Sequence, residues 1–171
     1  MAELLKHCLP PLIDKASRVL ILGTLPGDES LRRQQYYGHP RNHFWPMLGA
    51  VFSEAIDEDY ANRQTFLARR RLAIWDVLNS AERPGSLDTA IRSAVANDFS
   101  KLFDEHGALR AIIFNGQKAA ELFRRHITKA NGFPRDDISL IICPSTSPAN
   151  VMALHKKTDA WRKAFSDLGL V

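Results

Sequence analysis

The chain has 171 residues, of which 45% are hydrophobic and 25% are charged, and its formal net charge is +4 at pH 7. This length fits a single domain over residues 1–171 with a sizeable core, and the composition argues against a disordered chain or a membrane protein. The basic balance allows an anionic partner such as nucleic acid but does not by itself identify one.

The apolar runs predict neither a membrane span nor a secretory signal. The runs at 18–22 and 138–143 are far shorter than the roughly 20 residues that cross a bilayer. The first ten residues carry Glu3, Lys6 and His7 among short apolar stretches, which is not the pattern of a signal peptide. We therefore expect a cytoplasmic protein that does not bind membranes.

The cysteines and histidines argue against a metal centre. Cys8 and Cys143 are the only cysteines, so a four-cysteine zinc or iron–sulfur site cannot form, and we expect both thiols to be reduced. The histidines are scattered and show no HExxH spacing. We expect no metal, no cofactor and a monomer.

Strand and helix patterns alternate along the chain. In chain order we predict a strand at 18–23, helices at 44–52 and 60–72, a strand at 73–77, a helix at 98–106, a strand at 110–114, a helix at 117–127, a strand at 138–143 and a helix at 159–168. This alternation predicts an α/β fold with three layers, α/β/α, around a central and mostly parallel four-stranded sheet.

Ligands of such sheets bind at the carboxyl ends of the strands. Three connections begin there, at residues 24–42, 115–118 and 144–150. Asp76 also lies near a strand end, but the sequence does not show which side chains surround it.

The first connection is long and rich in groups that stack on, or hydrogen-bond to, planar heterocycles. Tyr37, His39 and Asn42 have no evident role in a core, so we interpret them as functional. Phe44 and Trp45 open a predicted helix, and we interpret them as core residues.

The last connection, PSTSPAN, holds closely spaced hydroxyl and backbone donors between prolines, which suits phosphate oxygens. An ordinary helix start, with Ser147 as the N-cap before Pro148, explains the same pattern. Lys156 and Lys157 follow this connection and are candidates for contacts with DNA.

Asn115 follows the third strand and precedes Gly116. Its amide has both a donor and an acceptor with which to read the edge of a base, but asparagine is also an ordinary turn residue at such a position.

Three segments together resemble a known family. GTLPG at 23–27, YYGHPRNHFW at 36–45 and PSTSPAN at 144–150 resemble the uracil-DNA glycosylase superfamily, and most closely its hypoxanthine-DNA glycosylase branch. The HPxNxFW pattern also resembles the mismatch-specific uracil-DNA glycosylases. The resemblance implies the three-layer fold and an enzyme that removes deaminated bases from DNA.

The resemblance also suggests catalytic residues. Most of the superfamily has an acidic or amide side chain in the first motif, where this chain has Leu25. In the hypoxanthine branch, the catalytic role belongs to the asparagine that matches Asn42. We expect Asn42 to orient water against the sugar. Donors for the leaving base would come from the backbone around Thr24 and Leu25, from His39 and from Asn115.

The resemblance assigns the remaining contacts to base and DNA. Tyr37 matches the aromatic residue that stacks on the flipped base, and Asn115 matches a base-reading position. The PSTSPAN segment would grip phosphates through Ser145, Ser147 and Asn150, with Lys156 beside them. The residue that inserts into the duplex stays open.

Hydrolysis of the N-glycosidic bond of a flipped deaminated base, above all hypoxanthine, is thus the predicted activity. Three alternatives stay open: a uracil or G·U mismatch glycosylase, a binder of damaged DNA without catalysis, suggested by Leu25, and an enzyme acting on free nucleosides. The sequence does not rank hypoxanthine against uracil or xanthine.

Overall fold

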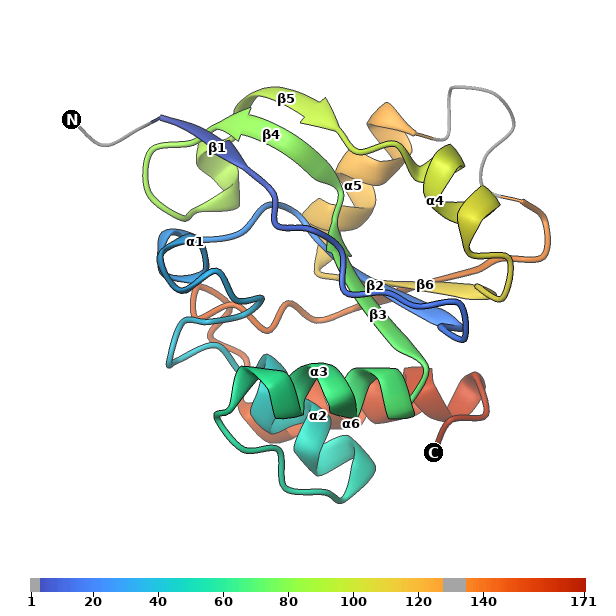
Figure 1. Cartoon of the computed structure of the whole chain (residues 1–171). Helices are drawn as coiled ribbons and strands as arrows, with labels where there is room; N and C mark the ends of the chain where they lie inside the picture. The colour runs from blue at the N-terminus through green and yellow to red at the C-terminus, as the bar shows by residue number, and fades with distance from the viewer. Residues whose placement is uncertain (1–3, 128–134) are drawn as a thin grey trace.

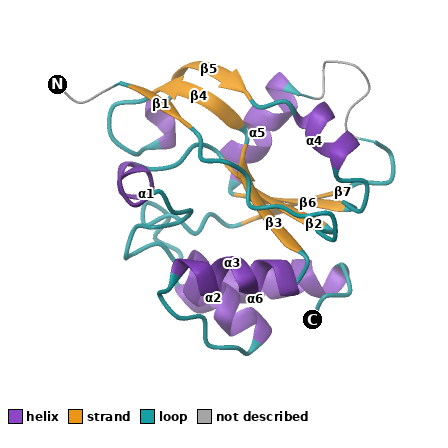
Figure 2. Cartoon of the chain, viewed as in Figure 1, coloured by secondary structure: helices purple, strands orange, loops and turns teal. Residues whose placement is uncertain are grey.

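A computed structural model describes residues 4–127 and 135–171. Its centre is a sheet of four strands in the order β3-β2-β6-β7, and every neighbouring pair is parallel (Figures 1 and 2). The strands are β2 (Val19–Gly23), β3 (Leu72–Asp76), β6 (Ala111–Asn115) and β7 (Ser139–Cys143). Each lies within a residue or two of its predicted bounds, so the predicted sheet is confirmed.

Helices cover both faces of this sheet, as predicted (Figure 2). One face carries α2 (Phe44–Phe52), α3 (Tyr60–Arg69) and α6 (Leu154–Asp167), and the other carries α4 (Phe99–Glu105) and α5 (Gln117–His126). The helix at 44–52 has the predicted bounds. α6 begins five residues before the expected start, because its first turn is exposed and lacks the apolar spacing that starts at Trp161.

Two hydrophobic clusters hold the layers together, one on each face of the sheet. Along β2, Val19 and Ile21 pack with α2, α3 and α6, whereas Leu20 and Leu22 pack with α4 and α5. Successive side chains of a strand point to opposite faces. A strand that is apolar at every position therefore suits a sheet buried on both sides.

A second, smaller sheet was not predicted. It contains β1 (Leu5–His7), β4 (Leu78–Glu82) and β5 (Arg92–Ala96) in the antiparallel order β1-β4-β5. β4 begins two residues after β3 ends, so the chain leaves the central sheet at Asp76 and enters the small sheet almost at once (Figure 1). A short 3-10 helix, η1 (Asp88–Ala90), lies between β4 and β5.

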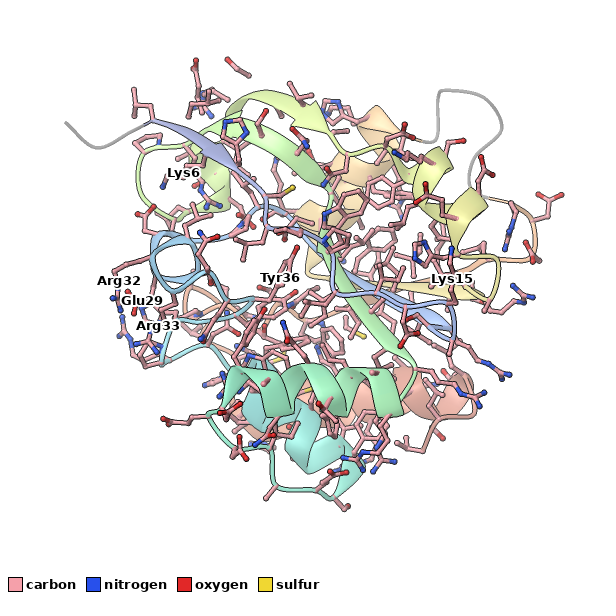
Figure 3. The ribbon with its side chains drawn as sticks, in the orientation of Figure 1. Lys6, Lys15, Glu29, Arg32, Arg33 and Tyr36 are labelled. Atoms are coloured by element: carbon pink, nitrogen blue, oxygen red, sulfur yellow. The ribbon has the colours of Figure 1, made fainter. Side chains whose placement is uncertain are left out.

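The predicted connection at 24–42 contains a short helix, α1 (Asp28–Arg33). On its outer side, Glu29 forms ion pairs with Arg32 and Arg33 at the edge of the molecule (Figure 3). Tyr36 follows in the interior, where its hydroxyl donates to the Leu9 carbonyl at 2.9 Å. None of the helices in the described part of the chain has the length and apolar character to cross a membrane.

Candidate active site

A cavity of about 500 Å³ lies at the carboxyl ends of β2, β3 and β6. Nine of the eleven candidate site residues line it: Thr24, Leu25, Tyr37, His39, Asn42, Asn115, Ser145, Ser147 and Asn150. Tyr37 and Asn42 from the first connection and Asn115 from the second therefore meet in one cavity.

Tyr37 forms an aromatic wall of this cavity. One face of its ring stacks on Phe44, with the centroids 3.9 Å apart, and the half-buried ring leaves the other face to border the cavity. Its backbone is left-handed, with φ at +54°, which is strained for an aromatic residue. Neighbouring contacts hold it, because Gly38 N–H donates to Ser30 Oγ at 3.0 Å and Trp45 Nε1 donates to the Tyr36 carbonyl.

Phe44 and Trp45 are buried in the core, as the sequence indicated. They open α2 and pack edge to face, with their centroids 5.0 Å apart. Phe44 thus links the core to the cavity, since it supports the Tyr37 ring from below.

Asn42 lies just before α2, with its side chain half-buried. Its Oδ1 accepts from the backbone N–H of Phe44 at 3.0 Å, and its own N–H donates to the His39 carbonyl at 2.9 Å. Because only the amide oxygen can accept from an N–H, this bond fixes the orientation of the side chain. The second lone pair of Oδ1 stays available to a ligand or a water molecule.

His39 lies on the same wall. Its Nδ1 accepts from the backbone N–H of Arg41 at 3.1 Å. An accepting Nδ1 places the hydrogen of the neutral ring on Nε2. His39 therefore offers a donor to a ligand in the cavity.

The segment after β2 is held by a buried arginine. Arg83 is 1% exposed, and its guanidinium donates to the carbonyls of Leu25, at 3.2 Å, and Pro26. Thr24 Oγ1 donates to Asp88 Oδ1 at 2.7 Å. Leu25 itself is buried and lines the cavity with carbon only, so it supplies no polar side chain there.

Asn115 joins the end of β6 to the 144–150 connection. Its Nδ2 donates to Thr146 Oγ1 and its Oδ1 accepts from Thr146 N–H, both at 2.9 Å. Both ends of the amide are therefore engaged with the protein, and a role in reading a base stays a prediction. Next to it, Gly116 has φ at +104°, and a Cβ there would lie 3.0 Å from the Cβ of Ser145, so this approach needs glycine.

The 144–150 connection folds on itself through side chains. Ser145 Oγ accepts from Ser147 N–H, and Ser147 Oγ accepts from Ala149 N–H, both at 3.2 Å. Asn150 Nδ2 donates to the Ser145 carbonyl at 2.9 Å. The two serine hydroxyls keep their hydrogens as donors, whereas the Asn150 amide is used to shape the loop.

The two lysines that follow have different environments. Lys156 is exposed on the first turn of α6, outside the set of cavity-lining residues. Lys157 is fully buried, and its Nζ donates to the carbonyls of Asn150, at 2.9 Å, and Ser147, at 3.4 Å. The interpretation of Lys157 as a DNA contact is therefore wrong, because its ammonium group is used inside the loop.

Two acidic residues at the cavity were not assigned a function from the sequence. Asp76 is 4% exposed, and its Oδ2 has no hydrogen-bond partner within residues 4–127 and 135–171. Asp88 comes from the segment 86–89, which forms one wall of the cavity. The sequence placed Asp76 near a strand end but could assign no role to either acid, because their neighbours in space come from other segments.

Burial raises the pKa of Asp76 to about 7, with Arg83 opposing this rise and Asp88 adding to it. Burial also raises the pKa of the Asp88 carboxyl, while its hydrogen bond from Thr24 opposes the shift. The pKa of Tyr37 is raised by burial and then by the Asp76 carboxyl, so its phenol stays neutral at physiological pH. A buried carboxyl that titrates near neutrality in a cleft is typical of functional sites.

Over the part of the chain that the structure describes, there is no cluster of three or more His, Cys, Asp or Glu side chains suited to a metal ion. The cavity is instead defined by an aromatic wall, an oriented amide, a histidine donor, a buried carboxyl and a loop of hydroxyl and backbone donors.

Comparisons with known proteins agree with this arrangement. A family model described as the uracil DNA glycosylase superfamily matches residues 10–169. The hypoxanthine DNA glycosylase of Methanosarcina barkeri is 39% identical over 94% of this chain and 98% of its own length. The hypoxanthine DNA glycosylase of Methanosarcina acetivorans is 36% identical over 95% of this chain and 99% of its own length.

A solved structure is similar over almost the whole chain. The solution NMR structure of a candidate uracil DNA glycosylase from Methanosarcina acetivorans superposes with a TM-score of 0.80 at 36% sequence identity. The match covers 96% of this chain and 99% of that one, so the two share their fold throughout.

Proposed function

Since this chain belongs to the uracil DNA glycosylase superfamily, we propose that it is a monofunctional DNA glycosylase that removes hypoxanthine from DNA. The observation that carries the proposal is the convergence of Tyr37, Asn42 and the 144–150 connection on one cavity at the carboxyl ends of the strands. These elements supply a stacking surface, an oriented acceptor and a group of phosphate donors. A flipped nucleotide needs all three.

The base enters the cavity against the open face of Tyr37. Stacking of a base on an aromatic ring contributes about 1–3 kcal/mol and tolerates either ring size. A cavity of about 500 Å³ has room for a purine and part of its sugar. The Phe44 ring behind Tyr37 keeps the stacking surface in place.

Hydrolysis breaks the bond between N9 of the base and C1′ of the sugar. The electron pair leaves with the base, and the sugar acquires oxocarbenium character. Water then adds through its oxygen to C1′ and loses a proton, while the departing base takes up a proton. Because the sugar is a strong electrophile at this stage, the water must be positioned rather than fully deprotonated.

Asn42 positions this water. Its bond from Phe44 N–H holds Oδ1 in one orientation, and the remaining lone pair accepts a hydrogen of the water. The oxygen of that water then faces C1′. Leu25 stands where the resemblance places an acid or amide in most of the superfamily, and its carbon side chain leaves this task to Asn42. From the same wall, His39 Nε2–H donates to the leaving base as negative charge develops.

Extrusion of the nucleotide needs a group that fills the gap in the duplex. Val151 follows the 144–150 connection and is 96% exposed, and Met152 beside it is 38% exposed. Proteins that deform DNA insert exposed apolar side chains between base steps, and Val151 lies directly after the loop that we propose to bind phosphates. We assign the wedge to Val151, with Ser145 and Ser147 on the flanking phosphates and Lys156 further along the backbone.

The direct test is release of base from a labelled inosine-containing duplex, read as abasic sites that break in alkali. The wild-type chain excises hypoxanthine in single-turnover reactions, and Asn42→Ala lowers the rate at least about 100-fold. Asn42→Asp retains most of the rate, since a carboxylate also accepts from Phe44 N–H and from water. Asn62→Ala on α3 is the matched control. Full activity of Asn42→Ala would overturn the assignment of this residue.

The same assay separates the other readings. Faster release of uracil than of hypoxanthine identifies a uracil or G·U mismatch glycosylase. Tight binding of damaged DNA with no release of any base identifies a binder without catalysis. Strong competition by free inosine identifies an enzyme of free nucleosides, which has no flanking phosphates for the 144–150 connection to bind.

A further inference from the structure

Asp76 is a buried acid at the base of the cavity that the mechanism above does not use. It ends β3 directly beside Gly23, which ends β2, and the two residues are paired in register. A Cβ on Gly23 would lie 2.7 Å from Asp76 Oδ1 and 3.3 Å from the Tyr37 hydroxyl. The absence of a side chain at Gly23 therefore lets the carboxyl pack directly beside it, close to the Tyr37 hydroxyl, and Asp76 is one of the residues that line the cavity.

The described residues supply no hydrogen bond to one oxygen of the Asp76 carboxyl group. Asp76 is buried, with only 4% of it exposed, and yet its Oδ2 has no hydrogen-bond partner among the described residues. The backbone of Asp76 is fixed, because Asn97 Nδ2 donates to its carbonyl at 2.8 Å. A buried polar atom without a partner is rare in folded proteins and calls for an explanation such as a ligand.

The charged and titratable groups around Asp76 do not supply the missing hydrogen bond to Oδ2. The groups that interact with it electrostatically are Cys8, Tyr36, Tyr37, Arg83 and Asp88. Arg83, the cation among them, is committed to the carbonyls of Leu25 and Pro26 and to Asp88 at 3.4 Å. Burial raises the pKa of Asp76 to about 7, so the neutral acid is well populated at neutral pH.

A neutral carboxyl group offers one O–H donor and one carbonyl acceptor side by side. Hypoxanthine has the complementary pair, since its six-membered ring carries an N1–H donor next to the O6 acceptor. Uracil has the same pair at N3–H and O4, and xanthine has it at N1–H and O6. A single acid at the end of the pocket therefore matches the edge that these deaminated bases share.

We propose that Asp76 reads this edge as a neutral acid: its carbonyl oxygen accepts from the ring N–H and its O–H donates to the exocyclic oxygen of the flipped base. The inference rests on the proposed function, and Asp76 touches the base rather than the sugar. Negative charge spreads to the exocyclic oxygen as the glycosidic bond breaks. The O–H bond to it then strengthens, which favours the transition state over the ground state.

The test measures single-turnover excision of hypoxanthine from about pH 5.5 to about pH 8.5. The wild-type rate falls through neutrality, by about tenfold per pH unit on the alkaline side, because ionisation removes the donor. Asp76→Asn keeps a donor and an acceptor but does not titrate, so its rate stays within about tenfold of the wild-type maximum and lacks this fall. Asp76→Ala lowers the rate about 100-fold or more.

A second substrate distinguishes recognition of the base edge by Asp76 from a general structural effect of substituting this residue. Unsubstituted purine lacks both O6 and N1–H, so its excision from the same duplex loses little in Asp76→Ala, while excision of hypoxanthine loses at least about 100-fold. Circular dichroism melting verifies that each variant is folded.

The outcomes distinguish the two proposals. If the wild-type chain releases no base at any pH, the proposed function fails. If it excises hypoxanthine but Asp76→Asn loses as much as Asp76→Ala, or the wild-type rate rises with pH through neutrality, the reading by a neutral Asp76 is wrong. Equal losses on hypoxanthine and on purine would also overturn it.

Discussion

The side-chain amide of Asn115 makes two hydrogen bonds to Thr146, one from each of its ends, and both are 2.9 Å long. Thr146 is fully buried, and its carbonyl in turn accepts from His43 N–H at 3.0 Å. This pair therefore joins the end of β6 to the 144–150 connection and, through His43, to the start of α2. The cavity wall formed by the 144–150 connection depends on it.

Asn115→Ala should destabilise this junction. Loss of the amide leaves two buried groups of Thr146 without partners, at about 1–3 kcal/mol each. Thr146→Val removes only the hydroxyl bond and should cost less. Urea unfolding of both variants and of the double variant measures the coupling between the two side chains. Additive losses would show that the pair does not act as a unit.

Asp76→Asn should stabilise the fold in alkali and leave it unchanged in acid. The pKa of Asp76 is about 7 in the folded chain against a usual value of 3.8, so the folded state holds a proton that the unfolded state has lost. Its contribution to stability is fully present below about pH 4, falls as pH rises to 7 and then stays low.

The three-unit difference corresponds to at most about 4 kcal/mol, at 1.36 kcal/mol for each pKa unit. Urea unfolding at pH 4 and at pH 8 measures the effect. Asp14→Asn, near the amino end of β2, provides a control acid outside the cavity. A gain from Asp76→Asn that is the same at both pH values would contradict the assigned protonation.

The adjacent lysines at the start of α6 should respond differently to the same substitution. Lys156→Ala should weaken DNA binding and reduce the slope of log K against log salt by about one, with no loss of stability, since Lys156 is exposed. Lys157→Ala should cost about 1–3 kcal/mol, because its buried ammonium holds the carbonyls of Ser147 and Asn150. Salt titration of binding and thermal melting separate the two.

Val151→Ser should impair excision from duplex DNA and spare excision from single strands. A single strand has no stacked partner to displace, so the wedge adds nothing there. With 96% of Val151 exposed, the variant should melt like the wild type. Val95→Ser, on the exposed face of β5, is the matched control. Equal losses on both substrates would exclude Val151 as the wedge.

The sequence predicted the central sheet because its strands are buried on both faces and are therefore apolar at nearly every position. It did not predict β1, β4 and β5, because these strands carry exposed polar residues among the apolar ones and β1 has only three residues. In β5, for example, Arg92, Ser93 and Val95 are exposed and no residue is fully buried. Such strands are recognisable only with their partners in place.

The candidate site, too, could be predicted from the sequence only in part. Tyr37, Asn42 and the 144–150 connection could be brought together from the sequence, because strand ends meet at one edge of a parallel sheet. The environment of Asp76 depends on the buried Arg83 and on Asp88, which reach it from the small sheet and the segment after it. The hydrogen bonds that occupy Asn115 and Lys157 depend likewise on a loop shape that the sequence does not encode locally.

Residues 86–89, which form one wall of the cavity, lie between β4 and β5 of the small sheet. Tyr37 and Asn42 belong instead to the layers around the central sheet. We expect substitutions or insertions in this segment to reshape one side of the pocket while Tyr37 and Asn42 keep their places. Under the proposed function, the choice of base and the hydrolytic step would then depend on different parts of the fold.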